Sequence, residues 1–316
     1  MAQYKVFVDG QEGTTGLEIN QRLQKRDDIE ILSIENEKRK DTGERSKYIN
    51  NADIVFLCLP DDAAREAVSL ITNPATRVID GSTAHRTHDG WAYGIPELSI
   101  QHRKAIENSK RVSVPGCYAS GFNIVMYPLV KEGIVPADYP ITCHAVTGYS
   151  GGGRRLIEIF ESEKNKQKLN SPCFYSLSLH HKHLPEMQKH SGLAGYPLFT
   201  PIISNYYRGM SVAIPLYTDM LSKKTTAAEL STFYHAYYEG QTFVKVFPAE
   251  SQNEFEWGYL NAESCNYTNN IEILVFGNDR QILVTSRLDN LGKGASGAAI
   301  QNMNIMLGLD EACGFN

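Results

Sequence analysis

The chain has 316 residues, of which 42% are hydrophobic and 21% charged, so its composition is that of an ordinary globular protein with one large domain or two moderate ones. A formal net charge of -5, without a basic arm or stripe, argues against nucleic acid as a partner. The six cysteines are widely spaced and form neither a CxxC pair nor a zinc-ligand pattern, which fits free thiols in a reducing compartment.

The chain opens on an apolar stretch at residues 4–9 that reads as a buried strand. No basic segment with an apolar run behind it precedes this stretch, so the sequence shows no signal peptide. No window approaches the roughly 20 apolar residues that a membrane helix needs. We therefore expect a cytoplasmic protein with no membrane segment.

A glycine-rich turn follows this first strand and leads into an amphipathic helix. Strand, glycine turn and helix form the context of a dinucleotide site, where glycines let the backbone approach a pyrophosphate at the helix N-terminus. The spacing is GxxGxxG rather than GxGxxG, and a turn with no ligand is the competing interpretation. The residues predicted to bind the cofactor here are Gly10, Gly13, Thr14, Thr15 and Gly16.

The end of the second predicted strand, residues 29–34, bears on the choice between NAD and NADP. An acid at this point holds the ribose hydroxyls of NAD, whereas a base holds the 2′-phosphate of NADP. Glu35 fits the first role, and the basic run 38–40 fits the second. We favour NADP, with Arg39, Lys40 and the hydroxyl of Ser33 as ligands. The alternative for the basic run is a solvated loop.

Further apolar strands alternate with helices through the first third of the chain. Residues 53–60, 77–80 and 111–114 read as strands, and residues 61–71 as a helix. This alternation predicts parallel βαβ units in a doubly wound α/β sheet, the Rossmann arrangement. Ligands bind at the carboxyl ends of such strands. The polar residues expected at that edge are Asp80, Ser82, Arg86 and Cys117.

Cys117 follows Pro-Gly and opens a predicted helix. The partial positive charge of a helix N-terminus stabilises a thiolate, and a thiolate is a nucleophile for an electrophilic carbonyl. A buried structural cysteine is the alternative. Because the glycine turn and Cys117 are both expected in one crevice, we favour the catalytic interpretation.

The sequence pattern changes after Pro128. Residues 140–146 predict a strand, and Ser150 with three glycines and Arg154 resembles an anion site that opens a helix over residues 156–168. A flexible glycine turn with solvated arginines is the alternative.

Three histidines lie within residues 180–183, shortly before Glu186. We expect no metal, because cysteine and aspartate ligands at fixed spacing are absent. We favour a histidine that acts as the acid/base partner of the Cys117 thiol. If the segment is extended, His181 and His183 project to one face and His180 to the other. A surface histidine cluster is the alternative.

The remaining elements suggest a second domain with a mixed sheet, because strands follow one another without alternating helices. We predict strands at 205–214, 271–276 and 281–287, the last two as a hairpin, and a helix at 226–238. A small-residue helix after residue 289 is expected to pack back on the first domain. The predicted division is a cofactor domain 1–117, completed by 291–316, and an α+β catalytic and oligomerisation domain 118–290.

Taken together, these motifs resemble the N-acetyl-gamma-glutamyl-phosphate reductase family, in its shorter branch, over nearly the whole chain. Each motif is weak alone, but the combination is specific. They are GxxGxxG at 10–16, Asp-Gly-Ser at 80–82 with Arg86, Tyr-Gly-Ile-Pro-Glu-Leu at 93–98, Pro-Gly-Cys-Tyr-Ala-Ser at 115–120, Ser-Gly-Gly-Gly-Arg at 150–154, His-Lys-His-Leu-Pro-Glu at 181–186, Arg-Gly-Met at 208–210 and Asp-Asn-Leu-Gly-Lys-Gly-Ala at 289–295.

The resemblance implies an NADP-dependent reduction of an acyl phosphate through a cysteine thioester, in arginine biosynthesis. It places the catalytic cysteine at Cys117, the family's histidines at His181 and His183, and the supporting residues at Ser150 and Glu186. We count Asn290 among the cofactor ligands. Arg86, Arg154 and Arg208 are the candidates for binding the substrate carboxylate or phosphate, because arginine pairs with both bidentately.

Three other functions stay open at this point. Aspartyl phosphate is an alternative substrate, although the histidine motif argues against it. A carrier-protein-linked aminoadipyl phosphate would call for basic residues around the pocket, which the net charge of -5 does not suggest. A non-enzymatic NADP-binding sensor is the most distant alternative. We expect a homo-oligomer, a dimer or a tetramer, and no nucleic-acid or membrane partner.

Overall fold

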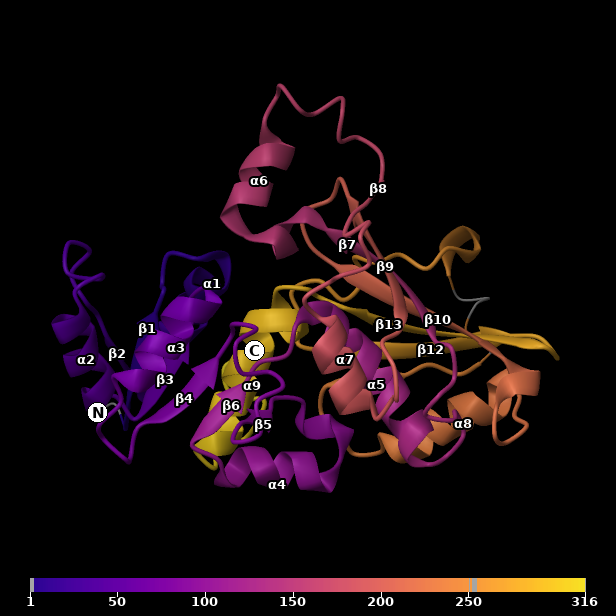
Figure 1. Ribbon diagram of the computed structural model, residues 1–316, viewed down its shortest axis with the longest axis horizontal. Helices are drawn as coiled ribbons and strands as arrows, with labels where there is room; N and C mark the ends of the chain where they lie inside the picture. Colours follow the sequence, from indigo (N-terminus) through magenta and orange to yellow (C-terminus); the bar gives the residue numbers. More distant parts are fainter. Residues whose placement is uncertain (1–2, 250, 252–254, 316) are drawn as a thin grey trace. The chain divides into compact units, whose positions relative to one another are not determined.

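The computed structural model describes residues 3–249, 251 and 255–315, which form two compact units (Figure 1). Unit 1 comprises Met1–Gly116 and Ala295–Asn316, and unit 2 comprises Cys117–Gly294. The chain therefore leaves unit 1 once and returns to it for its last residues. Across the described residues, no helix has the length and apolar character required to span a membrane.

Unit 1 is built on a parallel sheet of six strands in the order β2-β1-β3-β4-β6-β5. The predicted doubly wound parallel sheet is thereby confirmed. Its central strand β3 is buried at all four positions, as expected where helices cover both faces. The strands are β1 (Tyr4–Asp9), β2 (Ile29–Leu32), β3 (Ile54–Leu57), β4 (Arg77–Asp80), β5 (Ala92–Tyr93) and β6 (Arg111–Ser113).

Two hydrophobic cores flank this sheet, because successive side chains of a strand point to opposite faces. Val6 and Val8 of β1 join a core with residues of α1 and α9, whereas Phe7 joins another with residues of α2 and α3. The helices of unit 1 are α1 (Thr14–Leu23), α2 (Thr42–Asn51), α3 (Asp61–Ser69), α4 (Ile100–Asn108) and α9 (Gly297–Met306).

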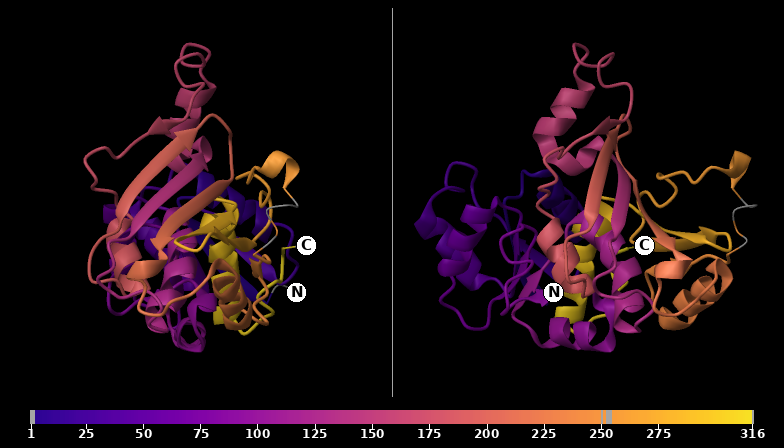
Figure 2. Two further views of the ribbon diagram at one scale, coloured as in Figure 1. Left: turned by 90° about the vertical axis from the view of Figure 1, so that its right-hand side faces the viewer. Right: turned by 45° about the vertical axis from the view of Figure 1, so that its right-hand side comes forward.

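Unit 2 is built on a mixed sheet of seven strands in the order β11-β12-β13-β10-β7-β9-β8, seen from two further sides in Figure 2. The pairs β7–β9 and β11–β12 are parallel and the other pairs antiparallel, which confirms the predicted mixed sheet. The strands are β7 (Thr142–Gly148), β8 (Cys173–Phe174), β9 (Leu198–Ser204), β10 (Met210–Tyr217), β11 (Val244–Val246), β12 (Ile271–Gly277) and β13 (Gln281–Leu288).

One face of this sheet is packed, and the other is open in the single chain. Val212, Ile214 and Leu216 of β10 are buried, whereas the alternate residues Pro215 and Tyr217 are half-buried and exposed. Helices α5 and α8 contact the strands of the packed face. The helices of unit 2 are α5 (Cys117–Lys131), α6 (Gly153–Glu161), α7 (Leu184–Ser191) and α8 (Ala227–Tyr237).

Several short helical turns complete the described chain. Four are 3₁₀ turns, and the last is a π-helical turn in the segment that returns to unit 1. They are η1 (Pro96–Leu98), η2 (Tyr149–Gly152), η3 (Thr218–Met220), η5 (Glu256–Gly258) and η6 (Gly292–Ser296).

Two predicted elements of the second half were wrong in extent, and one strand was missed. The helix predicted at 156–168 is α6, which ends at Glu161 because no apolar residue between Phe160 and Leu169 gives a further turn a face to bury. The strand predicted at 205–214 begins only at Met210, since residues 205–209 form a turn. Strand β9 was not predicted, because Pro197 and Pro201 obscure its strand pattern.

Candidate active site

Cys117 is the first residue of α5 in unit 2 and is partly exposed. No acidic residue lies in the first turn of this helix, so nothing there offsets the partial positive charge of its N-terminus. Three other thiols have different surroundings. Burial raises the pKa of Cys58 and of Cys265 to about 12, and it also raises the pKa of Cys143. These three stay protonated at neutral pH, which makes them poor nucleophiles.

Aromatic side chains gather beside Cys117. The ring of Tyr118, the next residue, lies 5.7 Å from the ring of His181 and 5.8 Å from that of His183. The Tyr175 hydroxyl donates to the Tyr118 hydroxyl at 2.9 Å. Burial raises the pKa of both phenols, and the nearby charge of Cys117 adds to the shift. Two protonated phenols therefore lie near the thiol, and two imidazoles lie beside the ring of the first phenol.

The two predicted histidines lie together, with their rings 4.7 Å apart and almost perpendicular. They are brought together by a turn that leads into α7, and not by the extended segment assumed from the sequence. The backbone N–H of His183 donates to Nδ1 of His181 at 3.1 Å, so the proton of a neutral His181 ring is on Nε2. His180 is exposed, and its Nδ1 lies 2.6 Å from the carbonyl oxygen of Ser178.

Glu186 lies in the first turn of α7 and is almost completely buried. Its Oε1 is 4.0 Å from Nε2 of His183, so a protonated His183 would face a carboxylate. Its backbone carbonyl accepts a hydrogen bond from the side-chain amide of Asn123 at 3.4 Å, which ties α7 to α5. Glu186, the predicted supporting acid, therefore lies next to His183.

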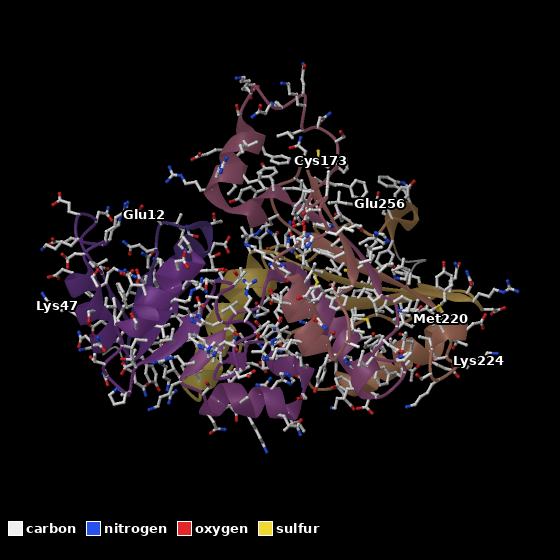
Figure 3. The ribbon with its side chains drawn as sticks, viewed as in Figure 1. Glu12, Lys47, Cys173, Met220, Lys224 and Glu256 are labelled. Carbon is white, nitrogen blue, oxygen red and sulfur yellow. The ribbon has the colours of Figure 1, made fainter. Side chains whose placement is uncertain are left out.

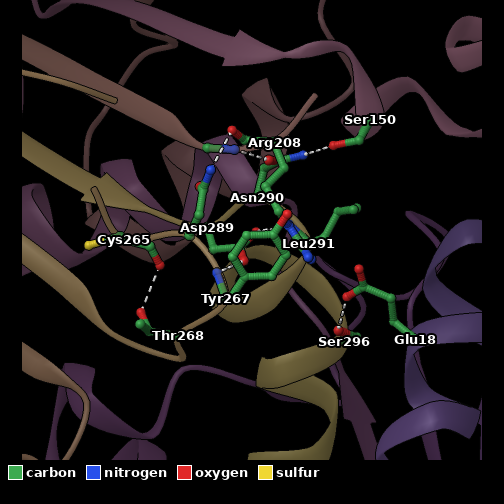
Figure 4. A network of polar contacts seen from close by, with 12 residues as sticks. Glu18, Ser150, Arg208, Cys265, Tyr267, Thr268, Asp289, Asn290, Leu291 and Ser296 are labelled. Atoms are coloured by element: carbon green, nitrogen blue, oxygen red, sulfur yellow. Dashed lines mark hydrogen bonds and ion pairs between the residues drawn. The ribbon is translucent and has the colours of Figure 1, made fainter. Parts of the chain in front are cut away.

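A second group of polar contacts joins four distant parts of unit 2 (Figure 4). The Asn290 amide nitrogen donates to the hydroxyl of Ser150 at 3.0 Å, and its oxygen accepts from the backbone N–H of Gly209 at 2.7 Å. Beside it, Nε of Arg208 donates to the buried carboxylate of Asp289 at 3.0 Å. Both ends of the Asn290 amide are therefore engaged inside unit 2, and its role toward the cofactor stays a prediction.

The other two predicted substrate arginines have different settings. Arg86, in unit 1, is buried and donates to the carbonyl oxygens of Val114 and Gly81 at 2.9 and 3.1 Å. Arg154 is exposed and pairs with Glu158 one helical turn later, at 3.0 Å. Their roles toward a substrate also stay predictions.

The glycine turn of unit 1 fits a diphosphate. Gly10 has φ +89°, and a Cβ on it would lie 2.2 Å from the carbonyl oxygen of Cys58. A Cβ on Gly16 would lie 2.5 Å from the carbonyl oxygen of Gly10. Gly13 caps α1 without a side-chain hydrogen bond, and no acid lies in the first turn. The N–H groups at the N-terminus of α1 therefore face no acidic side chain from the first turn that would compete with a diphosphate for them.

The basic run after β2 is exposed, and two of its cations have acidic partners. Lys38 pairs with Glu35 at 2.8 Å, and Arg39 pairs with Glu12. Glu12 lies inside the glycine turn and is labelled in Figure 3. Arg39 is therefore held next to the turn that would receive the cofactor. Ser33 and Lys40 are exposed near it in sequence.

Sequence reasoning missed some residues of these sites. Tyr118, Tyr175 and Asp289 carry no local signal of their own, although Tyr118 and Asp289 lie within two of the recognised motifs. The buried ion pair of Asp9 and Arg45, at 2.9 Å, was also missed. The signal that could have predicted this pair is the acidic residue Asp9 at the end of an apolar strand. Over the described residues, no cluster of three or more His, Cys, Asp or Glu side chains has a metal-binding arrangement.

The sequence matches two domain families and many curated proteins. Residues 5–109 match the semialdehyde dehydrogenase NAD-binding domain, and residues 117–290 match the semialdehyde dehydrogenase dimerisation domain. N-acetyl-gamma-glutamyl-phosphate reductase 2 of Nostoc sp. is 48% identical, over 99% of this chain and 100% of its own. The reductase of Trichormus variabilis is 47% identical with the same coverage, and reductase 2 of Pseudomonas putida is 46% identical over 98% of each chain.

The chain belongs to the N-acetyl-gamma-glutamyl-phosphate reductase family. It contains the family's dinucleotide-binding domain, and the predicted resemblance is confirmed.

Solved structures extend the likeness of fold beyond this family. Aspartate semialdehyde dehydrogenase II of Vibrio cholerae, solved with ASA, superposes with a TM-score of 0.71 at 13% identity, over 97% of this chain and 99% of that one. The Candida albicans aspartate semialdehyde dehydrogenase, solved with NADP, gives a TM-score of 0.62 at 15% identity, over 97% and 99%. The reductase family thus shares its fold with these enzymes.

Proposed function

We propose that this protein reduces N-acetyl-gamma-glutamyl phosphate to N-acetylglutamate 5-semialdehyde and phosphate with NADPH, a step of arginine biosynthesis. The observation that carries the proposal is the near-full-length identity of 46–48% to three reductases of that name. The setting of Cys117 supports it, because a thiol at a helix N-terminus, with imidazoles close to the next residue, suits acyl transfer.

The reaction proceeds in two halves on Cys117. The thiolate attacks the carbonyl carbon of the acyl phosphate, a C–S bond forms, the C–O bond to phosphate breaks, and phosphate leaves. A nicotinamide cofactor bound at the glycine turn would supply the hydride that reduces the carbonyl carbon of the resulting thioester. The oxygen takes up a proton, giving a thiohemiacetal. When the C–S bond breaks, the aldehyde leaves and the sulfur is restored as a thiolate or thiol.

His181 is the proposed acid/base group. Its Nδ1 accepts a backbone N–H, and Nε2 is proposed as the ring atom that exchanges a proton with the thiol and with the hemiacetal oxygen. His183 is proposed to bind the substrate or its phosphate, with Oε1 of Glu186 4.0 Å from its Nε2. Ser150 is proposed to support the site from η2. Tyr118 is buried and Tyr175 half-buried, and their hydrogen-bonded phenols are proposed to limit the access of water to the thiol.

The cofactor is proposed to be NADP. The residues that would hold its diphosphate are those of the glycine turn, where the backbone leaves room only for glycine at positions 10 and 16. Arg39 and Lys40 would hold the 2′-phosphate, with Ser33 as a further donor. A 2′-phosphate of about two negative charges would compete well with the single carboxylate of Glu12 for Arg39.

We also propose that the protein assembles as a homodimer or a tetramer through the open face of the seven-stranded sheet. Phe174, Leu198, Tyr217 and Leu283 are exposed on that face, in the region that matches a dimerisation domain. Large apolar side chains on one sheet face are typical of protein interfaces. A second copy would cover them.

The decisive experiment follows NADPH formation from N-acetylglutamate semialdehyde, NADP and phosphate. Efficient turnover that depends on phosphate, with NAD used far less well, is the expected result. Aspartate semialdehyde serves as the competing substrate and should react poorly. A protein that binds NADP but turns over neither semialdehyde would be a sensor and would overturn the proposal.

A further inference from the structure

Gly294 lies directly against the side chain of Cys117. A methyl group on Gly294 would lie 2.7 Å from Cβ of Cys117 and 3.3 Å from its Cα. The first of these distances is too short for two carbon atoms, so any side chain at this position must displace the cysteine or the turn. One side of the nucleophile is therefore shaped by a backbone that has no side chain.

Gly294 is held in place by the π-helical turn η6. Its N–H donates to the carbonyl oxygen of Asp289, five residues earlier, at 2.9 Å. π-Helical turns are rare and occur frequently at functional sites. The position of Gly294 against Cys117 thus depends on where the backbone of Asp289 is fixed.

The side chain of Asp289 fixes that backbone from several directions (Figure 4). The carboxylate is fully buried; Oδ1 accepts from the N–H of Leu291 at 2.9 Å, and Oδ2 from the N–H of Tyr267 at 2.7 Å. Oδ1 also accepts from Nε of Arg208 at 3.0 Å. The guanidinium of Arg208 lies 4.6 Å from the centre of the Tyr267 ring. A buried carboxylate with this many donors is a rigid anchor.

We propose that Arg208 and Asp289 are positioning residues for the Cys117 thiol, acting through the π-helical turn and the contact of Gly294. The inference rests on the proposed function only in taking Cys117 as the reacting thiol. It gives Arg208 a role in the free enzyme, before any substrate is bound. Removing the charge of Asp289 leaves Arg208 uncompensated, and a lysine at position 208 keeps the charge but loses the planar guanidinium that contacts Asp289 and the Tyr267 ring. Either change therefore weakens the anchor.

The test measures alkylation of Cys117 by iodoacetamide in the free enzyme across pH, with peptide mass spectrometry to separate this thiol from the others. The variants are Gly294→Ala, Asp289→Asn and Arg208→Lys. We expect each to slow the Cys117 reaction about tenfold or more, or to move its pH midpoint, because small displacements of a reacting group cost up to about a hundredfold. Turnover should fall through kcat, with KM little changed.

Two controls match these changes within unit 2. Gly195→Ala adds a methyl group where no atom lies within 4 Å, and Glu272→Gln removes the charge of another buried ion pair, with Arg287 at 2.5 Å. Both should leave the alkylation profile of Cys117 unchanged. If the controls change it as much as the test variants do, the effect is general loosening and the proposal is wrong.

An unchanged alkylation profile in Gly294→Ala and Arg208→Lys, with a raised KM for the acyl phosphate in Arg208→Lys, would make Arg208 a substrate ligand and overturn the positioning role. These two variants decide the question even if Asp289→Asn does not fold. A wild-type Cys117 that reacts no faster than Cys173, yet is slowed in Gly294→Ala, would count against the thioester chemistry and support the positioning role.

Discussion

Cys117 differs from the other described thiols in its place at the N-terminus of a long helix, where partial positive charge favours the thiolate. Burial has the opposite effect at Cys58, Cys143 and Cys265, whose pKa values it raises. The surroundings of a thiol decide how reactive it is, so we expect Cys117 to react faster than these three cysteines.

Cys117→Ser should abolish turnover and leave cofactor binding intact, because the hydroxyl is far less nucleophilic than the thiolate while the glycine turn belongs to unit 1. Turnover and NADP binding by fluorescence titration check both halves. The control is Cys173→Ser, on the edge strand β8 and labelled in Figure 3, which should keep full activity. Near-normal turnover of Cys117→Ser would remove the thioester mechanism.

The histidines are expected to separate by role. His181→Ala and His183→Ala should each lower turnover severely, since a positioned acid/base group contributes about 10²–10⁴-fold. His180→Ala should be mild, because this side chain is exposed. The pH dependence of Cys117 alkylation distinguishes the pair: loss of the acid/base should raise the apparent pKa of the thiol, and loss of the substrate ligand should raise KM alone. His180→Ala as the most damaging variant would contradict this assignment.

At the scale of elements, we propose that the glycine turn and the loop after β2 together decide the choice of cofactor. The pair of Arg39 with Glu12 joins these two segments, and neither partner is buried. An exposed ion pair contributes little to stability, about 0–1 kcal/mol, so its residues are free to serve binding.

Replacing Arg39 and Lys40 with glutamine should weaken NADP binding about tenfold or more and spare NAD, because hydrogen bonds to a charged phosphate contribute about 1.5–3 kcal/mol. Isothermal titration with both cofactors measures the difference. Lys47→Gln, an exposed lysine paired with Glu44, is the matched control. Equal weakening of both cofactors, or of neither, would mean that the basic run is a solvated loop and would return Glu35 to consideration as a ribose ligand.

Arg26 links three segments of unit 1. It donates to Asp28 at 2.8 and 2.5 Å, to the side-chain oxygen of Asn304 in α9 at 2.6 Å, and to the carbonyl oxygen of Cys313 at 3.3 Å. Its hydrogen bonds lower the pKa of Asp28 below the ordinary 3.8. The stabilisation is therefore complete above that value and is lost as the pH falls through the lower folded-state pKa.

Arg26→Met should lower the free energy of unfolding by about 3 kcal/mol at pH 7. The difference from wild type should shrink in acid, as the pH falls through the lowered folded-state pKa of Asp28 and the group becomes protonated in both proteins. Thermal unfolding at pH 7 and across this acid range measures the change. Arg65→Met, which breaks an exposed pair with Asp62, should have little effect at either pH. A deficit that stays constant with pH would show that the Asp28 charge contributes nothing.

At the scale of the whole molecule, the open sheet face of unit 2 exposes large apolar side chains to solvent in the single chain. Its exposed apolar side chains alternate with buried ones along the same strands. The alternating pattern therefore places one set of apolar residues in the core and the other set on the open face.

Leu198→Asp should shift the protein toward monomer, because a charge at a covered apolar position is costly to bury. Sedimentation velocity measures the shift. Leu198 is 49% exposed in the single chain, so the fold should survive the change. Ile100→Asp, at an exposed position of α4 in unit 1, is the control and should sediment like wild type. Identical sedimentation of Leu198→Asp and wild type would exclude this face as the interface.

Local signals in the sequence were sufficient for much of the fold. Apolar runs predicted β1 and β4 at their observed bounds, and Thr226 marked the start of α8, which it caps through Glu229. The hairpin of β12 and β13 followed from two strand patterns around a polar turn. Cys117 was recognised as the start of a helix. Each of these signals involves residues only a few positions apart, so the local sequence is sufficient to predict the element.

The tertiary structure alone decided which distant residues meet. Arg208 and Asp289 are 81 positions apart, and no local sequence pattern near either residue predicts their ion pair. The turn that brings His181 onto His183, the contact of Gly294 with Cys117, and the inclusion of β9 despite its prolines likewise depend on how the elements pack. Sequence by itself determined the fold class and most of the elements, and it predicted the role of Cys117, because these follow from periodicity, helix ends and residue type. Packing determined the partners, because burial and distance are properties of the folded chain.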